Sequence, residues 1–171
     1  MERHPVAFDY QLSQTLAKLL NPGLLLVSSK KDGQSNVMAI GWGTVGIIWG
    51  KPIFQVLVRP SRYTYEFIED SMVFTVNVPM EAMRRWVGIT GSVSGRQVDK
   101  FGKYNVATSA AQNIATVTID DCPLVYECRV VHYNDVLPPH LSGEIERGAY
   151  KGSDYHRIYF GQILGVYAAT V

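Results

Sequence analysis

The chain has 171 residues, of which 47% are hydrophobic, and 16 basic against 15 acidic residues leave a formal net charge of +1. This length fits one domain, and this hydrophobic share is typical of a globular protein with a buried core. We therefore expect a single domain over residues 1–171 and exclude a disordered chain. The balanced charge gives no electrostatic basis for binding nucleic acid or an anionic membrane surface.

The two cysteines, Cys122 and Cys128, predict a reducing compartment. If residues 124–131 form one strand, the two Cα atoms lie ~20 Å apart, beyond the ~7 Å limit for a disulfide. No further Cys or His pair completes a zinc pattern, so we expect no metal site. The N-terminal segment has no signal-peptide pattern, and no run of ~18 apolar residues exists. We expect a cytoplasmic protein without a membrane span.

The first predicted element is an amphipathic helix. Four leucines recur at intervals of three and four residues, the spacing of one helix face, namely Leu12, Leu16, Leu19 and Leu20. Asp9 is the candidate N-cap. Asn21-Pro22-Gly23 predicts the end of the helix.

Short strands dominate the rest of the chain. An Asp-Gly hairpin signal lies at Asp32-Gly33. We expect strands at residues 24–28, 35–48, 53–58, 72–78, 114–119, 124–133, 141–145 and 158–167. We expect short helices at residues 63–70 and around residues 80–87, with a polar loop over residues 88–102 that could contain a helical turn. Such strands with glycine-rich turns predict an antiparallel barrel or sandwich decorated by helices.

A glycine-rich segment over residues 35–44 is the first candidate site. Its small residues leave backbone groups that could hydrogen-bond the edge of a flat heterocycle, but taken alone the segment favours an ordinary strand with a bulge. Gly41, Gly43 and Gly46 reproduce the spacing of a dinucleotide-binding fingerprint. No helix is predicted after them, so we reject a Rossmann fold.

The segment Arg59-Pro60-Ser61-Arg62-Tyr63-Thr64 is the second candidate. It connects a predicted strand to a predicted helix, and helix N-termini bind phosphate through free N–H groups and a partial positive charge. Two arginines add charge-assisted hydrogen bonds. The alternative is a helix capped by Ser61 with solvated arginines.

Two further features carry weaker signals. Residues 94–101 form a polar loop that runs into a turn. No histidine pairs with Ser or Cys in a catalytic motif, but His140 and His156 lie in predicted loops beside strands and could reach a pocket.

Taken in order, these segments resemble the flavin reductase-like family of FMN-binding split-barrel proteins, which includes flavoredoxin. The similarity runs from about residue 21 to residue 167. Its motifs are Asn36-Val37-Met38-Ala39-Ile40-Gly41-Trp42, the Arg59–Thr64 segment, Phe74-Thr75-Val76-Asn77-Val78-Pro79, Ser94-Gly95-Arg96 with Asp99-Lys100-Phe101, Glu127-Cys128, and Phe160-Gly161-Gln162-Ile163-Leu164-Gly165.

The resemblance implies a mainly β fold, a six-stranded antiparallel Greek-key split β-barrel with short decorating helices. It implies a homodimer with FMN near the subunit interface. Asn36, Val37, Met38 and Ala39 would follow the isoalloxazine edge, and Arg59, Ser61, Arg62 and Thr64 would hold the phosphate. Asn77, Ser94 and Lys100 would lie near the ribityl chain or the partner's flavin. Trp42 would pack near the flavin or serve as a core or interface residue.

The resemblance further implies an NAD(P)H-dependent flavin reductase that uses NADH or NADPH as electron donor. Hydride would pass from the nicotinamide to flavin N5, so the flavin carries the chemistry and no catalytic side chain is expected. One alternative is a flavoredoxin-like FMN carrier reduced by a protein electron partner. Another is a non-catalytic flavin-binding module.

Overall fold

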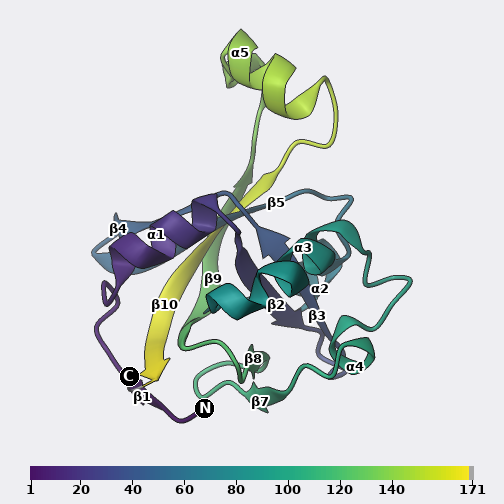
Figure 1. Cartoon of the computed structure of the whole chain (residues 1–171). Helices are drawn as coiled ribbons and strands as arrows, with labels where there is room; N and C mark the ends of the chain where they lie inside the picture. The colour runs from purple at the N-terminus through teal and green to yellow at the C-terminus, as the bar shows by residue number, and fades with distance from the viewer. Residues whose placement is uncertain (170–171) are drawn as a thin grey trace.

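The computed structural model describes residues 1–169 and contains one large antiparallel sheet (Figure 1). The hydrogen-bonded order of its strands is β3-β2-β6-β9-β10-β5-β4, and β1 pairs with β10 off this path. Strands β7 and β8 form a separate two-stranded sheet. The strands are β1 (Arg3–Pro5), β2 (Leu24–Ser29), β3 (Ser35–Ile40), β4 (Gly43–Ile48), β5 (Lys51–Val58), β6 (Val73–Val78), β7 (Thr108–Ala110), β8 (Val117–Ile119), β9 (Leu124–Asp135) and β10 (Arg157–Ala169).

Short helices surround this sheet. Helices α2, α3 and α4 contact β3, and α1 contacts β4. The helices are α1 (Leu12–Leu20), α2 (Tyr63–Ser71), α3 (Arg84–Ser92), α4 (Lys100–Lys103) and α5 (Gly143–Ile145), with the short helical segments η1 (Glu81–Met83), η2 (Pro138–His140) and η3 (Glu146–Tyr150). Among the described residues, no helix is long and apolar enough to cross a membrane.

The mainly β, antiparallel class predicted from the sequence is confirmed. The large sheet has eight strands, more than the six of the expected barrel. One addition is β1. The other arises because residues 35–48 form two strands, β3 and β4, which separate at Gly41 and Trp42.

Strand β2 is covered on both faces, and all six of its residues are buried. Leu24 and Leu26 face the main core inside the sheet. Leu25 and Val27 face a second cluster that includes Val87 of α3. A strand buried on both faces has a continuous apolar run in its sequence, and this run predicts β2.

The N-terminal helix begins differently from the prediction. Its N-cap is Gln11, which has left-handed backbone angles and makes no side-chain capping bond. Asp9 contributes only its backbone carbonyl, which accepts from the N–H of Leu12. Of the predicted leucine stripe, Leu19 is fully buried while Leu20 is 86% exposed, so the apolar face of α1 is narrower than its spacing suggests.

Two predicted segments change type in the structure. Residues 88–92, expected as the start of a loop, continue α3, because buried Val87 and Thr90 keep that face of the helix against β3 and β2. Residues 141–145, expected as a strand, form none: residues 143–145 are helix α5, and the whole stretch belongs to a projecting segment. Leu141 and Ile145 lie outside both core clusters.

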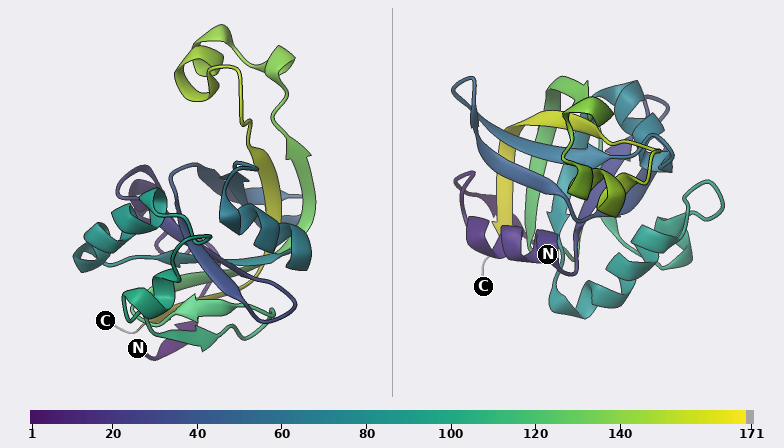
Figure 2. Two further views of the ribbon diagram at one scale, coloured as in Figure 1. Left: turned by 90° about the vertical axis from the view of Figure 1, so that its right-hand side faces the viewer. Right: turned by 90° about the horizontal axis from the view of Figure 1, so that it is seen from above.

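The projecting segment, residues 136–156, is called the arm here. It leaves the end of β9, contains η2, α5 and η3, and returns into β10 (Figures 1 and 2). Its base is held by Arg157, whose guanidinium donates to Asp135 at 2.7 and 3.0 Å and to Glu69 of α2 at 3.1 Å. Helix α2 and the arm are therefore fixed to the same two strands.

A buried carboxylate ties the loop after β7 to the sheet. Glu127 of β9 is 1% exposed. Its oxygens accept from the N–H groups of Gln112 and Asn113 at 2.8 and 2.7 Å and from the Asn113 side-chain amide at 2.9 Å. These bonds give the Glu127-Cys128 motif a structural role.

We predict that Glu127→Ala lowers the free energy of unfolding by about 1–3 kcal/mol, because the charged acceptor that ties the N–H groups of Gln112 and Asn113 to β9 is lost. The measurement is urea unfolding followed by circular dichroism. Glu144→Ala, at an exposed arm position, is the control and should change it by less than about 0.5 kcal/mol. Equal effects of the two substitutions would contradict this role.

Candidate functional site

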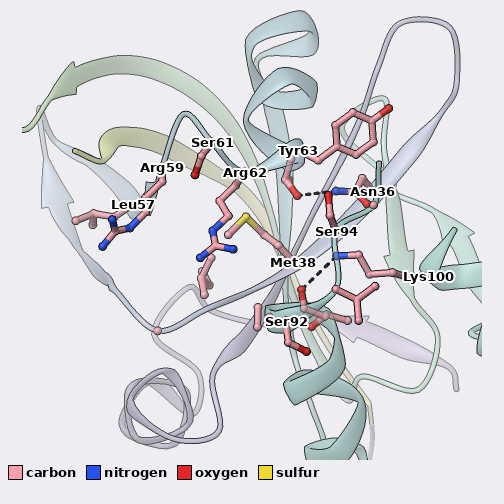
Figure 3. Close-up of a pocket in the computed structure, with 18 of the residues that line it drawn as sticks. Asn36, Met38, Leu57, Arg59, Ser61, Arg62, Tyr63, Ser92, Ser94 and Lys100 are labelled. Carbon is pink, nitrogen blue, oxygen red and sulfur yellow. Dashed lines mark hydrogen bonds between the residues drawn. The ribbon is translucent and has the colours of Figure 1, made fainter. Parts of the chain in front are cut away.

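A cavity of about 300 Å³ opens between β3, the β5–α2 turn and the end of α3 (Figure 3). This volume lies at the lower end of the ~300–1,000 Å³ typical of small-molecule sites. Ten of the predicted site residues line it, namely Asn36, Met38, Ala39, Trp42, Arg59, Ser61, Arg62, Thr64, Ser94 and Lys100.

The charge of this lining is one-sided. Arg59, Arg62 and Lys100 line the cavity, and no Asp or Glu is among the residues that surround it. Helix α2, which starts at Tyr63, adds the partial positive charge of its N-terminus. The arrangement therefore favours an anionic ligand.

The turn between β5 and α2 is built differently from a conventional cap. The N-cap residue of α2 is Arg62, in extended conformation and without a side-chain capping bond. Ser61, the predicted N-cap, instead donates its hydroxyl to Asp154 of the arm at 2.6 Å. Arg59 donates to the carbonyl of Ala149 at 2.7 Å, so both residues are engaged by the arm.

Arg62 differs from its neighbours. Within residues 1–169 its guanidinium makes no hydrogen bond or ion pair. In Figure 3 it projects into the cavity near Met38, whereas Arg59 lies beside Leu57. Arg62 is thus the arginine of this turn that is available to a ligand.

The β3 wall is shaped by a buried amide. The side chain of Asn36 donates to the hydroxyl of Thr64 at 2.8 Å, which joins β3 to the first turn of α2 (Figure 3). A Cβ atom at Gly95 would collide with the Asn36 side chain and press on Tyr63. Glycine at residue 95 therefore allows the Ser94 loop to close this end of the cavity.

Lys100 is a buried cation in the opposite wall. Only 3% of the residue is exposed, and its ammonium group donates to the carbonyls of Val37 at 2.6 Å and Thr90 at 3.2 Å. Burial, and to a lesser extent the positive charge of Arg62, lowers the pKa of Lys100 to about 8. An anion in the cavity would favour its protonated form.

The arm supplies one further wall through His156. Its ring lies 4.8 Å from that of Trp42, and its Nδ1 atom is 3.0 Å from the hydroxyl of Tyr150. Burial, with the charge of Arg59 next, lowers the pKa of His156 to about 4, so this imidazole is neutral at pH 7. His140, the other histidine considered from the sequence, is exposed and does not line the cavity.

Two predicted site residues lie elsewhere. The side chain of Val37 points into the second core cluster, and only its carbonyl reaches Lys100. Asn77 is completely buried in β6, where it donates to the carbonyl of Leu25 and accepts from the N–H of Ile119 at 2.9 Å. Neither side chain lines the cavity, because both face the small second core instead.

Several lining residues lie outside every candidate segment of the sequence, in particular those at the end of α3. They include Thr90, Gly91, Ser92 and Val93. The signal that could have found them is the continued helical spacing of Met83, Trp86, Val87 and Thr90. Gly91 contacts β3 closely, since a Cβ there would lie 3.4 Å from that of Ala39.

We predict a characteristic pH dependence from Lys100. Between pH 8 and 10.5 the unfolded chain retains a proton that the folded chain has lost, so the free energy of unfolding rises with pH. In Lys100→Met this contribution is absent. The free energy of unfolding of the wild type minus that of the variant should therefore rise by up to about 1.4 kcal/mol per pH unit in this window. Urea unfolding at several pH values measures it, and a constant difference would contradict the buried, destabilised charge.

Comparison with known proteins places the chain in a family. Residues 18–170 match the model of the flavin reductase like domain. Over 119 residues the chain is 30% identical to the uncharacterised protein YddH of Escherichia coli K12. That match covers 67% of this chain and 62% of YddH, so the chain spans less than two thirds of that relative.

Solved structures agree with this fold. A flavoredoxin from Methanosarcina acetivorans aligns with a TM-score of 0.68 and 27% identity, covering 86% of this chain and 68% of that one. An FMN-binding domain of a flavin reductase-like enzyme from Shewanella baltica OS155 aligns with a TM-score of 0.67 and 21% identity, covering 98% and 77% respectively. With most of its length matched by the family model, the chain belongs to the flavin reductase like domain family.

Proposed function

We propose that the chain binds FMN in this cavity and acts as a flavin-dependent oxidoreductase. The observation that carries the proposal is a cavity lined by Arg59, Arg62 and Lys100, without a carboxylate, beside the N-terminus of α2. FMN combines a flat apolar ring with a phosphate. The β3 wall offers the small residue Ala39 and backbone groups to the ring, and the positive end offers charge to the phosphate.

The electron donor we propose is NADH or NADPH. Bound FMN would accept a hydride at N5 and pass the electrons on. The chain's own contribution is to hold and orient the ring and to exclude water. Lys100 would place a positive charge in the wall, and neutral His156 would offer a ring nitrogen on the arm side. Family membership supports the oxidoreductase class; the nicotinamide step is an inference from the family resemblance.

A second candidate is a flavoredoxin-like electron carrier that keeps FMN and is reduced by a protein partner. It is favoured by the similarity to a flavoredoxin at 27% identity. Both candidates need the same cofactor site, and they differ in whether a nicotinamide reduces the bound flavin directly.

We also propose a homodimer. Large apolar side chains are exposed outside the cavity, and Trp49 at the β4–β5 turn packs 5.8 Å from the rings of both His132 and Phe160. Exposed apolar side chains that gather on one surface are typical of interfaces. The exposed residues include Ile47, Trp49, Val131, Tyr133, Leu137 and Ile145. A cytoplasmic location is part of the proposal, supported by the free, buried Cys122 and Cys128.

The proposed activity predicts that purified protein takes up FMN and that NADH or NADPH bleaches the visible absorbance of the bound flavin under anaerobic conditions. Free FMN with the same nicotinamide is the control. Bound flavin that resists both nicotinamides but is bleached by a chemical reductant supports the carrier. Protein that takes up no FMN leaves a non-catalytic or unrelated module and refutes both candidates.

The dimer proposal predicts that Trp49→Asp converts a dimer to a monomer in light scattering coupled to gel filtration, because a charge would be buried at the interface. Thr108→Asp, on the exposed strand β7, introduces the same charge elsewhere and should leave the mass unchanged. A monomeric wild type would refute the proposal.

A further inference from the structure

The β5–α2 turn faces both the arm and the cavity, and different hydrogen-bond donors of the turn point to each. Asp154 of the arm is held in a left-handed conformation with φ 53°. Its carboxylate accepts from the backbone N–H of Ser61 at 3.2 Å and from the Ser61 hydroxyl at 2.6 Å. An internal anion therefore already occupies the Ser61 side of the turn.

Arg59 completes this contact. Its guanidinium donates to the arm carbonyls of Ala149 at 2.7 Å and Asp154 at 3.3 Å and lies 3.8 Å from the Asp154 carboxylate. It also stands over the ring of Tyr150, 5.3 Å from the ring centroid. Because these contacts are several and mutually supporting, Arg59 is committed to the arm. We call the contacts among Arg59, Ser61 and Asp154 the clasp.

The donors that remain form a second group. The Arg62 guanidinium has no partner within the described residues. At the start of α2 the N–H of Tyr65 already donates to the carbonyl of Arg62 at 3.0 Å, so the N–H groups of Tyr63 and Thr64 are the helix donors left for a ligand.

The charges also divide between the arm and the cavity. Arg59 balances Asp154, while Arg62 is left to face the charge of about −2 on a phosphate monoester, and Lys100 adds positive charge from the opposite wall. Both anions can thus be held at once, without one displacing the other.

The clasp also sets the far wall of the cavity. His156 follows Asp154 by two residues, and its ring lies against Trp42 at 4.8 Å. A shift of Asp154 would move His156 and Trp42 relative to β3. Such a shift would change the affinity of the cavity for a flavin ring, whether or not the ligand carries a phosphate.

We propose that Asp154 is a positioning residue that reserves Ser61 and Arg59 for the arm, so that the Arg62 guanidinium and the N–H groups of Tyr63 and Thr64 hold the flavin phosphate. This inference rests on the proposed FMN site and replaces the expectation that Arg59 and Ser61 contact the phosphate. Asp154 acts through the wall formed by His156 and Trp42 and does not touch the ligand.

The test compares the dissociation constants of FMN and of riboflavin, which lacks the phosphate, by quenching of flavin fluorescence. The dissociation constant of riboflavin divided by that of FMN measures how much the phosphate contributes to binding. In Arg62→Ala we expect this ratio to fall at least tenfold while riboflavin affinity is unchanged. In Asp154→Asn and in Ser61→Ala we expect both constants to rise threefold or more with the ratio preserved.

Glu144→Gln, which removes one negative charge from an exposed position of the same arm, is the matched control and should alter neither constant. Trypsin gives an independent reading, since Arg147 and Lys151 lie in the arm. Cleavage there should accelerate in Asp154→Asn and Ser61→Ala but not in Arg62→Ala. Thermal melting identifies any variant that fails to fold, and Ser61→Ala tests the clasp if Asp154→Asn does not fold.

Three results would overturn the inference. Tighter binding of FMN alone in Asp154→Asn would mean that Asp154 competes with the phosphate. A fall in the ratio of the riboflavin to the FMN dissociation constant in Ser61→Ala would mean that Ser61 contacts the phosphate. Unchanged constants in Asp154→Asn and Ser61→Ala would remove the positioning role. A wild type that binds neither FMN nor riboflavin would instead refute the proposed function itself.

Discussion

The pairing of β9 with β10 is the interaction on which the rest of the structure depends. These strands span 12 and 13 residues, and β10 also pairs with β5 and β1. The register shifts near Gly161 and Gly165, and a Cβ at Gly161 would collide with Phe74 and Cys128. Glycine permits this close, bulged pairing, which bends the sheet around its core and directs the arm back toward the β5–α2 turn.

Because of this pairing, charged side chains gather where the β5–α2 turn meets the returning arm. Arg157 at the start of β10 fixes the arm and α2 to the same strands, so the turn before α2 and the return of the arm must meet. Asp154 satisfies part of the positive charge gathered there. Lys100 is held apart by backbone carbonyls in the opposite wall. The cavity keeps a positive character because no carboxylate is among its lining residues: Arg59 is held by groups of the arm, Lys100 by backbone carbonyls, and the Arg62 guanidinium has no partner within the described residues.

Sequence patterns predicted the parts of the fold in which burial follows local periodicity. The buried run of β2 and the strand-to-helix turn at Arg59–Thr64 lie where they were expected, and most candidate site residues converge on one cavity. The strand predicted at residues 141–145 is wrong because Leu141 and Ile145 lie outside the core, and the spacing of apolar residues there does not report packing. The sequence could not show that the Asn77 side chain lies outside the cavity, because a buried amide in a strand has the same pattern whether its partner is a ligand or, as here, the N–H of Ile119.

The arm is an insertion between two strands that are already neighbours in the sheet. Its length and sequence can change without disturbing the register of β9 and β10, because closing a longer surface loop costs little. What must be preserved is the short return segment with Asp154 and His156. The framework thus separates a cavity floor carried by the paired strand β3 from an outer wall carried by the arm, so a change in the arm would reshape that wall and leave the strand pairing as it is.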